Sequence, residues 1–75
     1  MKVAIVHNNE EKSKEVTAQL LHLLASEGIE VSDHDPQLVI SVGGDGTLLS
    51  AFHRFNHLLD RVKFVGVHTG HLGFY

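Results

Sequence analysis

The spacing of hydrophobic residues changes along the chain, and each change predicts a boundary between elements. Residues 2–7 (KVAIVH) are a short, nearly continuous apolar run with three β-branched side chains, typical of a strand buried on both faces. From residue 10 the apolar side chains recur at a helical spacing and share one face: Val16, Leu20, Leu23 and Leu24. Because Gly28 then stands where helix ends favour glycine, we predict a helix over residues 10–27.

The rest of the chain repeats this alternation. Residues 29–31 read as a short strand, and residues 38–42 and 62–67 as buried strands. A second helix is predicted over residues 47–59, with one apolar face that we expect to lie in the core: Leu48, Phe52, Phe55 and Leu59. Strands that alternate with helices form parallel sheets with right-handed crossovers. The predicted fold class is therefore α/β, a Rossmann-like parallel sheet with flanking helices.

Composition limits the classes of protein that fit. The chain has 75 residues, no cysteine and a net charge of −3 with neutral histidines, so we expect one small domain, residues 1–75, without disulfides. The negative charge argues against nucleic acid or an anionic membrane as the main partner. No apolar run approaches the ~20 residues of a membrane span, and we expect a cytoplasmic protein. Because Phe74 and Tyr75 directly follow a glycine loop, we also expect the domain to continue beyond residue 75.

Two glycine-rich loops follow predicted strands, at residues 43–47 (GGDGT) and 68–73 (HTGHLG). Ligands of parallel sheets bind at the carboxyl ends of the strands, where both loops lie. Three glycines in the first loop permit a close approach of the backbone to a ligand, and the helix start that follows offers unpaired amides to an anion. The loop is neither a Walker loop nor a dinucleotide-binding fingerprint, yet it predicts a phosphate site.

Asp45 in the middle of this loop needs its own explanation, because phosphates repel a carboxylate. It could hold a magnesium ion that bridges phosphates, or accept the proton of a hydroxyl that attacks a phosphoryl group. Both roles belong to phosphoryl transfer. The alternative is a tight turn in which the side chain of Asp45 or Thr47 caps the helix.

The two loops together resemble a known family. GGDGT after a buried strand is shared by NAD kinases, by lipid kinases of the diacylglycerol and sphingosine type and, in shortened form, by phosphofructokinases. Residues 66–74 (GVHTGHLGF) resemble the G-[VI]-x-x-G-x-L-G-F segment of NAD kinases, which the lipid kinases lack at this spacing. The chain is thus similar to the N-terminal portion of an NAD kinase of the low-G+C Gram-positive bacterial type.

The resemblance implies phosphorylation of the 2′-hydroxyl of the adenosine ribose of NAD by ATP, with Mg²⁺ or another divalent cation. Asp45 matches the catalytic aspartate of the family, Gly46 lies against the dinucleotide, and Phe74 packs on the adenine. Further positions of the site wall are Gly44, Leu49, His71 and Tyr75. The family often has Asn in place of His68, and some members have a basic residue in place of Ser50, so we assign no ligand contact to either.

The resemblance also implies a homotetramer and a second, mainly β domain with an Asn-Glu or Asn-Asp motif. In the family this motif and this domain come later than the two loops, where the present sequence has only Phe74 and Tyr75, so we expect the 75 residues to be inactive alone. Two other functions stay open at this point, a lipid kinase and a non-catalytic nucleotide-binding module. Two further groups have spacings that occur in metal sites, but both fit a solvated surface and we assign no metal to them: the pair His53 and His57, and the pair Asp33 and Asp35.

Overall fold

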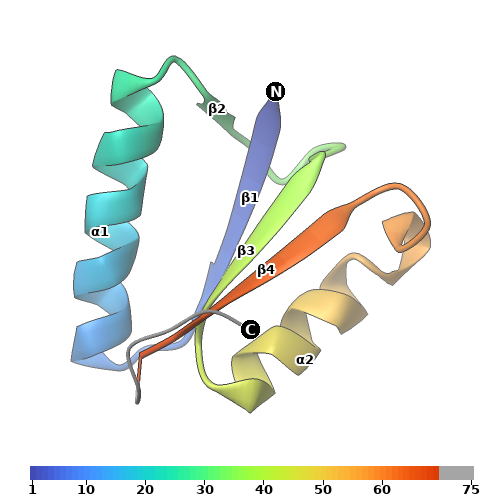
Figure 1. Cartoon of the computed structure of the whole chain (residues 1–75). Helices are drawn as coiled ribbons and strands as arrows, with labels where there is room; N and C mark the ends of the chain where they lie inside the picture. The colour runs from blue at the N-terminus through green and yellow to red at the C-terminus, as the bar shows by residue number, and fades with distance from the viewer. Residues whose placement is uncertain (70–75) are drawn as a thin grey trace.

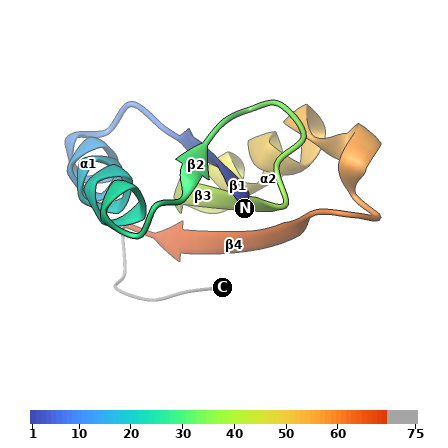
Figure 2. The same cartoon turned by 90° about the horizontal axis from the view of Figure 1, so that it is seen from above.

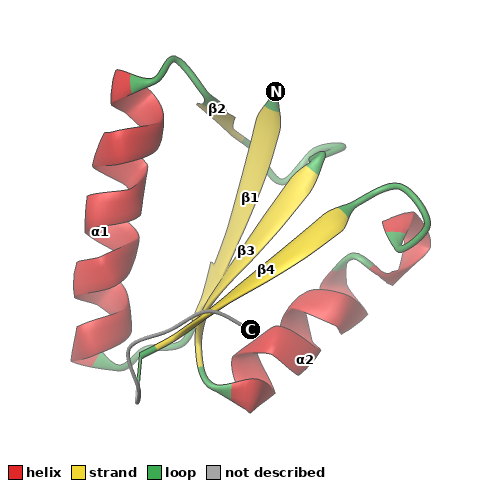
Figure 3. Cartoon of the chain, in the orientation of Figure 1, coloured by secondary structure: helices red, strands yellow, loops and turns green. Residues whose placement is uncertain are grey.

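The computed structural model describes residues 1–69 and shows one parallel sheet between two helices (Figures 1 and 3). The elements follow in the order β1 (Lys2–His7), α1 (Glu11–Ser26), β2 (Glu30–Val31), β3 (Leu38–Gly43), α2 (Asp45–Arg54), the 3₁₀ turn η1 (Asn56–Leu58) and β4 (Lys63–His68). All strand pairs are parallel, and the order across the sheet is β2-β1-β3-β4. The predicted α/β class is confirmed.

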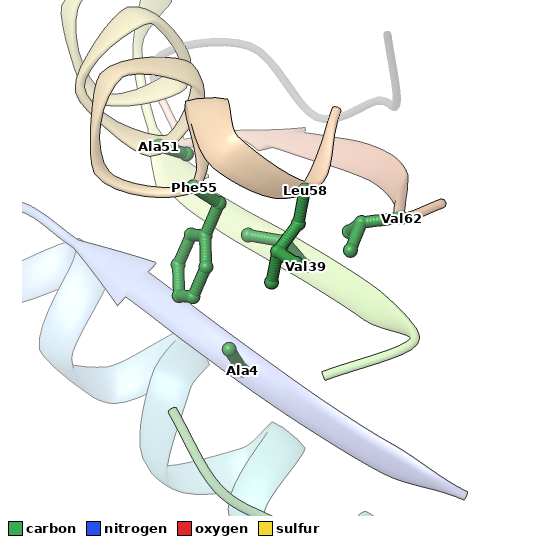
Figure 4. Packing of buried hydrophobic residues seen from close by; sticks show 6 residues of the cluster. All are labelled: Ala4, Val39, Ala51, Phe55, Leu58 and Val62. Atoms are coloured by element: carbon green, nitrogen blue, oxygen red, sulfur yellow. The ribbon is translucent and has the colours of Figure 1, made fainter. Parts of the chain in front are cut away.

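The two helices cover opposite faces of the sheet (Figures 1 and 2). Side chains of a strand alternate between its faces, so the central strands β1 and β3 each contribute to two cores. On the α1 side the buried hydrophobic residues are Val3, Leu24, Ile40 and Val42. On the α2 side they are Ala4, Val39, Ala51, Phe55, Leu58 and Val62 (Figure 4).

Helix α1 has nearly the predicted bounds. Gly28 has φ +71° and follows the helix end, as predicted. Its amide and that of Ile29 donate to the carbonyls of Ala25 and Leu24, which is a Schellman motif. The expected face is partly wrong, since Leu23 is 56% exposed and the buried residues are Ser13, Thr17 and Leu24. At about 100° per residue, Leu23 lies at the edge of that stripe rather than at its centre.

The second helix differs more from its prediction. It begins at Asp45, ends at Arg54 and is followed by η1, instead of running over residues 47–59. Phe55 leaves helical geometry with φ −113° and ψ 26°, which lets both Phe55 and Leu58 reach the α2-side core. The expected apolar face shifts accordingly. Phe55 is buried as predicted, whereas Phe52 is 36% exposed and rests edge-on against Phe64 at 4.8 Å between ring centroids.

The polar segment between β2 and β3 lies on the surface. A carboxylate oxygen of Asp33 accepts a hydrogen bond from the guanidinium of Arg54 at 2.6 Å, and Asp35 lies 3.7 Å from the His34 ring. The two histidines of the H-x-x-x-H pattern fall in different elements, α2 and η1. Within residues 1–69 no three His, Asp or Glu side chains are grouped to hold a metal ion. Over the same residues, no helix has the length and apolar character needed to cross a membrane.

Candidate functional site

The strand order creates a switch point between β1 and β3. The chain leaves β1 towards β2 on one side and continues from β3 towards β4 on the other, so the connections diverge where these two strands end. Such divergence opens a crevice at the carboxyl edge of a parallel sheet. Helices α1 and α2 both begin at this edge (Figure 1). A pocket of about 370 Å³ lies here and is lined by Val6, His7, Asn8, Glu10, Gly44, Gly46, Thr47 and Ser50.

Gly43, the last residue of β3, allows the two sides of the pocket wall to lie close together. Its φ is +154°, a conformation that residues with a side chain rarely adopt. A Cβ at this position would collide with the hydroxyl of Thr47 and lie 2.8 Å from the amide nitrogen of the Asn8 side chain. Only a glycine therefore leaves room at the end of β3 for the side chains of Asn8, which follows β1, and of Thr47 in α2.

The start of α2 presents backbone donors without acceptors. Gly44 is the N-cap, and its carbonyl accepts from the amides of Thr47 and Leu48. The amides of Asp45 and Gly46 precede the first intrahelical bond, and residues 1–69 supply no acceptor for them. Since no side chain in the described part of the chain caps this helix, the interpretation of Asp45 or Thr47 as a cap is wrong. Two free amides at a helix N-terminus favour an anionic ligand.

Asp45 and Leu49 form an exposed strip beside these amides. Asp45 is in the first turn of α2 and Leu49 follows one turn later, 56% exposed. Thr47, between them, points the other way and is buried. The structure thus places a solvent-accessible carboxylate and an uncovered apolar side chain one turn apart on the same side of α2.

The end of β1 supplies part of the pocket that the sequence patterns did not reveal. The backbone amide of Asn8 donates to the Val42 carbonyl at 3.3 Å. Its side-chain oxygen accepts from the amide of Glu10 and its side-chain nitrogen donates to the Glu10 carboxylate, both at 3.1 Å. These bonds hold Asn8 and Glu10 in the pocket wall. One available signal was that β1, as a parallel strand, must end at the same edge as the two glycine loops.

The end of β4 is bonded to the same edge. The amide of Thr69 donates to the carbonyl of Gly43 at 2.9 Å, and the hydroxyls of Thr69 and Ser13 lie 3.2 Å apart. The second loop therefore begins directly beside the first. Its later predicted site residues lie outside the described residues: His71, Phe74 and Tyr75.

Comparison with known sequences decides the family. The sequence model of the ATP-NAD kinase N-terminal domain matches residues 5–75. The chain belongs to the NAD kinase family. It is 73% identical to the NAD kinase of Enterococcus faecalis and 55% identical to that of Levilactobacillus brevis, over all 75 residues in each case. The NAD kinase of Lactobacillus delbrueckii subsp. bulgaricus is 57% identical over the same length.

The chain spans 28% of the length of these curated relatives. The family match confirms the resemblance of the two loops to NAD kinases. It supports neither the lipid kinase nor the non-catalytic alternative. The roles of individual residues stay predictions. The structure places Gly44 and Gly46 in the lining of the pocket between β1 and β3, and Asp45 and Leu49 on an exposed side of the first two turns of α2.

Proposed function

We propose that the full-length protein carrying this chain is an NAD kinase that transfers the γ-phosphate of ATP to the 2′-hydroxyl of the adenosine ribose of NAD. One observation supports this most directly. At the start of α2, an exposed carboxylate stands next to two amides that have no acceptor within residues 1–69. The amides can donate hydrogen bonds to a phosphoryl group, and the carboxylate can accept one from the hydroxyl that attacks it. The site can therefore bind both reacting groups of a phosphoryl transfer.

Asp45 acts on the acceptor in this proposal. Its carboxylate orients the ribose hydroxyl or takes its proton as the bond to phosphorus forms. The amides of Asp45 and Gly46, with the helix dipole behind them, stabilise negative charge on the transferred group. Leu49 offers the sugar and base an apolar surface one turn away. From the family resemblance we propose that Phe74, His71 and Tyr75 also bind the substrate.

The pocket residues fit a magnesium ion that arrives with ATP. Magnesium in phosphoryl-transfer sites is held mostly by phosphate oxygens and water, with one or two protein carboxylates. Glu10 supplies a carboxylate in the pocket wall. The bound ion would neutralise phosphate charge. From the family resemblance we further propose a cytoplasmic homotetramer whose second, mainly β domain completes the site.

The test is Asp45→Asn in the full-length protein, with NADP formation and NAD binding both measured. We expect kcat to fall by about 10²-fold or more, because the amide keeps the shape of the side chain but cannot accept the proton. NAD affinity should change little.

Asp60→Asn is the matched control, since Asp60 is an exposed carboxylate in the segment between η1 and β4. It should leave both quantities unchanged. Unchanged turnover in the Asp45 variant would remove this residue from the mechanism. Absence of NADP formation by the unaltered full-length protein would refute the proposed function itself.

A further inference from the structure

Two hydrogen bonds from different elements fix Thr69, the residue that follows β4. Its amide donates to the Gly43 carbonyl at 2.9 Å and continues the pairing of β3 with β4. Its hydroxyl lies 3.2 Å from that of Ser13. Ser13 is fully buried in the first turns of α1, so this partner is itself held in place.

These two bonds connect the three places where the chain leaves the sheet at the site edge. Ser13 belongs to the connection after β1, Gly43 begins the loop that carries Asp45, and Thr69 begins the loop after β4. A strand end held by its backbone bond alone can still turn about that bond. A side-chain bond to a second element removes this freedom and sets the direction in which the chain leaves β4.

We propose that Ser13 and Thr69 are positioning residues for NAD, an inference that rests on the proposed function. Their hydrogen bond fixes the start of the second loop relative to Asp45, two residues beyond Gly43. NAD affinity depends on this spacing, because the dinucleotide contacts residues of both loops. Neither hydroxyl touches substrate or takes part in the chemical step.

A simpler role for Ser13 is to let α1 lie close to the sheet by being small. Thr17 shows that the two roles can be separated. It is buried one turn further along the same face of α1, and its hydroxyl has no partner within residues 1–69. If small size were the whole reason for Ser13, alanine would serve as well. If the hydrogen bond matters, Ser13→Ala and Thr69→Val should raise KM for NAD to the same extent.

The experiment measures steady-state kinetics of the full-length protein with Ser13→Ala, Thr69→Val, Thr69→Ser and Thr17→Val. The first two remove the hydrogen bond, and we expect each to raise KM for NAD about threefold to tenfold, the range for loss of one neutral hydrogen bond. kcat at saturating NAD should stay within about twofold, because the lost contact acts on binding and not on the transition state alone. Thr69→Ser keeps the hydroxyl and should restore KM.

Thr17→Val is the matched control, since it removes a buried hydroxyl that has no partner and preserves volume. A double variant of Ser13 and Thr69 should be no worse than either single variant, because both remove the same bond. A KM for NAD equal to that of the wild type in the Ser13→Ala protein would overturn the inference. This result decides even if the Thr69→Val protein does not fold and cannot be assayed. A rise in KM for Thr17→Val equal to that for Thr69→Val would overturn it as well. The proposed function is tested separately by the wild-type protein, which must form NADP in the same assays. If it does, a negative result with the variants contradicts only the positioning role of Ser13 and Thr69.

Discussion

Gly43 carries a steric requirement that no other glycine of the loop shares. A side chain here would collide with Thr47 and approach Asn8, and the backbone has φ +154°. Around Gly44 and Gly46 a Cβ would meet no atom within 4 Å. Three glycines of one loop that look equivalent in the sequence therefore have different reasons to be there.

Gly43→Ala should lower the free energy of unfolding by about 1–3 kcal/mol or more, because backbone strain adds to the collision with Thr47. Gly46→Ala is the matched control and should leave stability unchanged or raise it by up to about 1 kcal/mol, since alanine is the better residue in a helix. Thermal or denaturant unfolding measures both. Equal effects of the two substitutions would contradict the steric role of Gly43.

The residues of the site divide by how they could be recognised. Gly44, Asp45 and Gly46 stand out because a carboxylate between glycines at a helix start is chemically conspicuous. Asn8, Ser13 and Thr69 do not, because each is a common polar residue. Ser13 and Thr69 are partners from distant parts of the sequence, and the place of Asn8 depends on its backbone bond to Val42 in β3. Their roles depend on which strand ends are neighbours, and only the sheet order supplies that.

At the scale of elements, the hydrophobic spacing found both helices but misjudged parts of their buried faces. It favours large apolar residues, whereas the structure buries Ser13 and Thr17 of α1 and Thr47 and Ala51 of α2. Small side chains let a helix lie close to the sheet, and both pairs include residues near the helix starts. Closeness of approach is a property of two packed elements, so the spacing within one segment cannot reveal it.

The two phenylalanines near the end of α2 provide a test of this correction. Phe55 is 3% exposed in the core with Ala4, Val39 and Leu58, whereas Phe52 is 36% exposed. Phe55→Ala should cost about 3–5 kcal/mol, the range for a buried aromatic side chain. For Phe52→Ala we expect a loss of about 1–2 kcal/mol, mostly from its edge-on contact with Phe64.

Denaturant unfolding with a common slope gives both values, and Leu59→Ala is the control. Leu59 is 50% exposed, although the sequence pattern placed it on the same apolar face. Its truncation should change stability by no more than about 0.5 kcal/mol. If all three substitutions were equally costly, the predicted continuous helix over residues 47–59 would describe the packing better than α2 followed by η1.

At the scale of the whole molecule, the alternation of strands and helices was enough to predict a parallel α/β sheet. The order of strands was not predictable in the same way. The segment Glu30–Val31 pairs with β1, and β3 lies on the other side of β1. Nothing in the spacing of hydrophobic residues states which side of β1 each strand takes. That choice places the crevice between β1 and β3, and with it Asn8 and Glu10 in the pocket wall.

The charge of the whole chain predicts a strong dependence of solubility on pH. Seven histidines accompany a net charge of −3, and the isoelectric point is close to 6.1. Histidine is the residue type that changes charge between about pH 5 and 8, so acidification takes this chain through zero net charge to a positive value. Because self-association is greatest where net charge vanishes, solubility should be lowest near pH 6.1.

Turbidity and sedimentation of the 75-residue chain between about pH 7.5 and 5.5 measure this minimum. A variant with glutamine in place of four exposed histidines tests this dependence: His22, His34, His53 and His57. The net charge then reaches zero only after more carboxylates are protonated, and the minimum should move to lower pH. An equal number of exposed glutamines or asparagines exchanged for serine should leave it in place. Constant solubility across this range would show that the histidines do not control the charge of the chain.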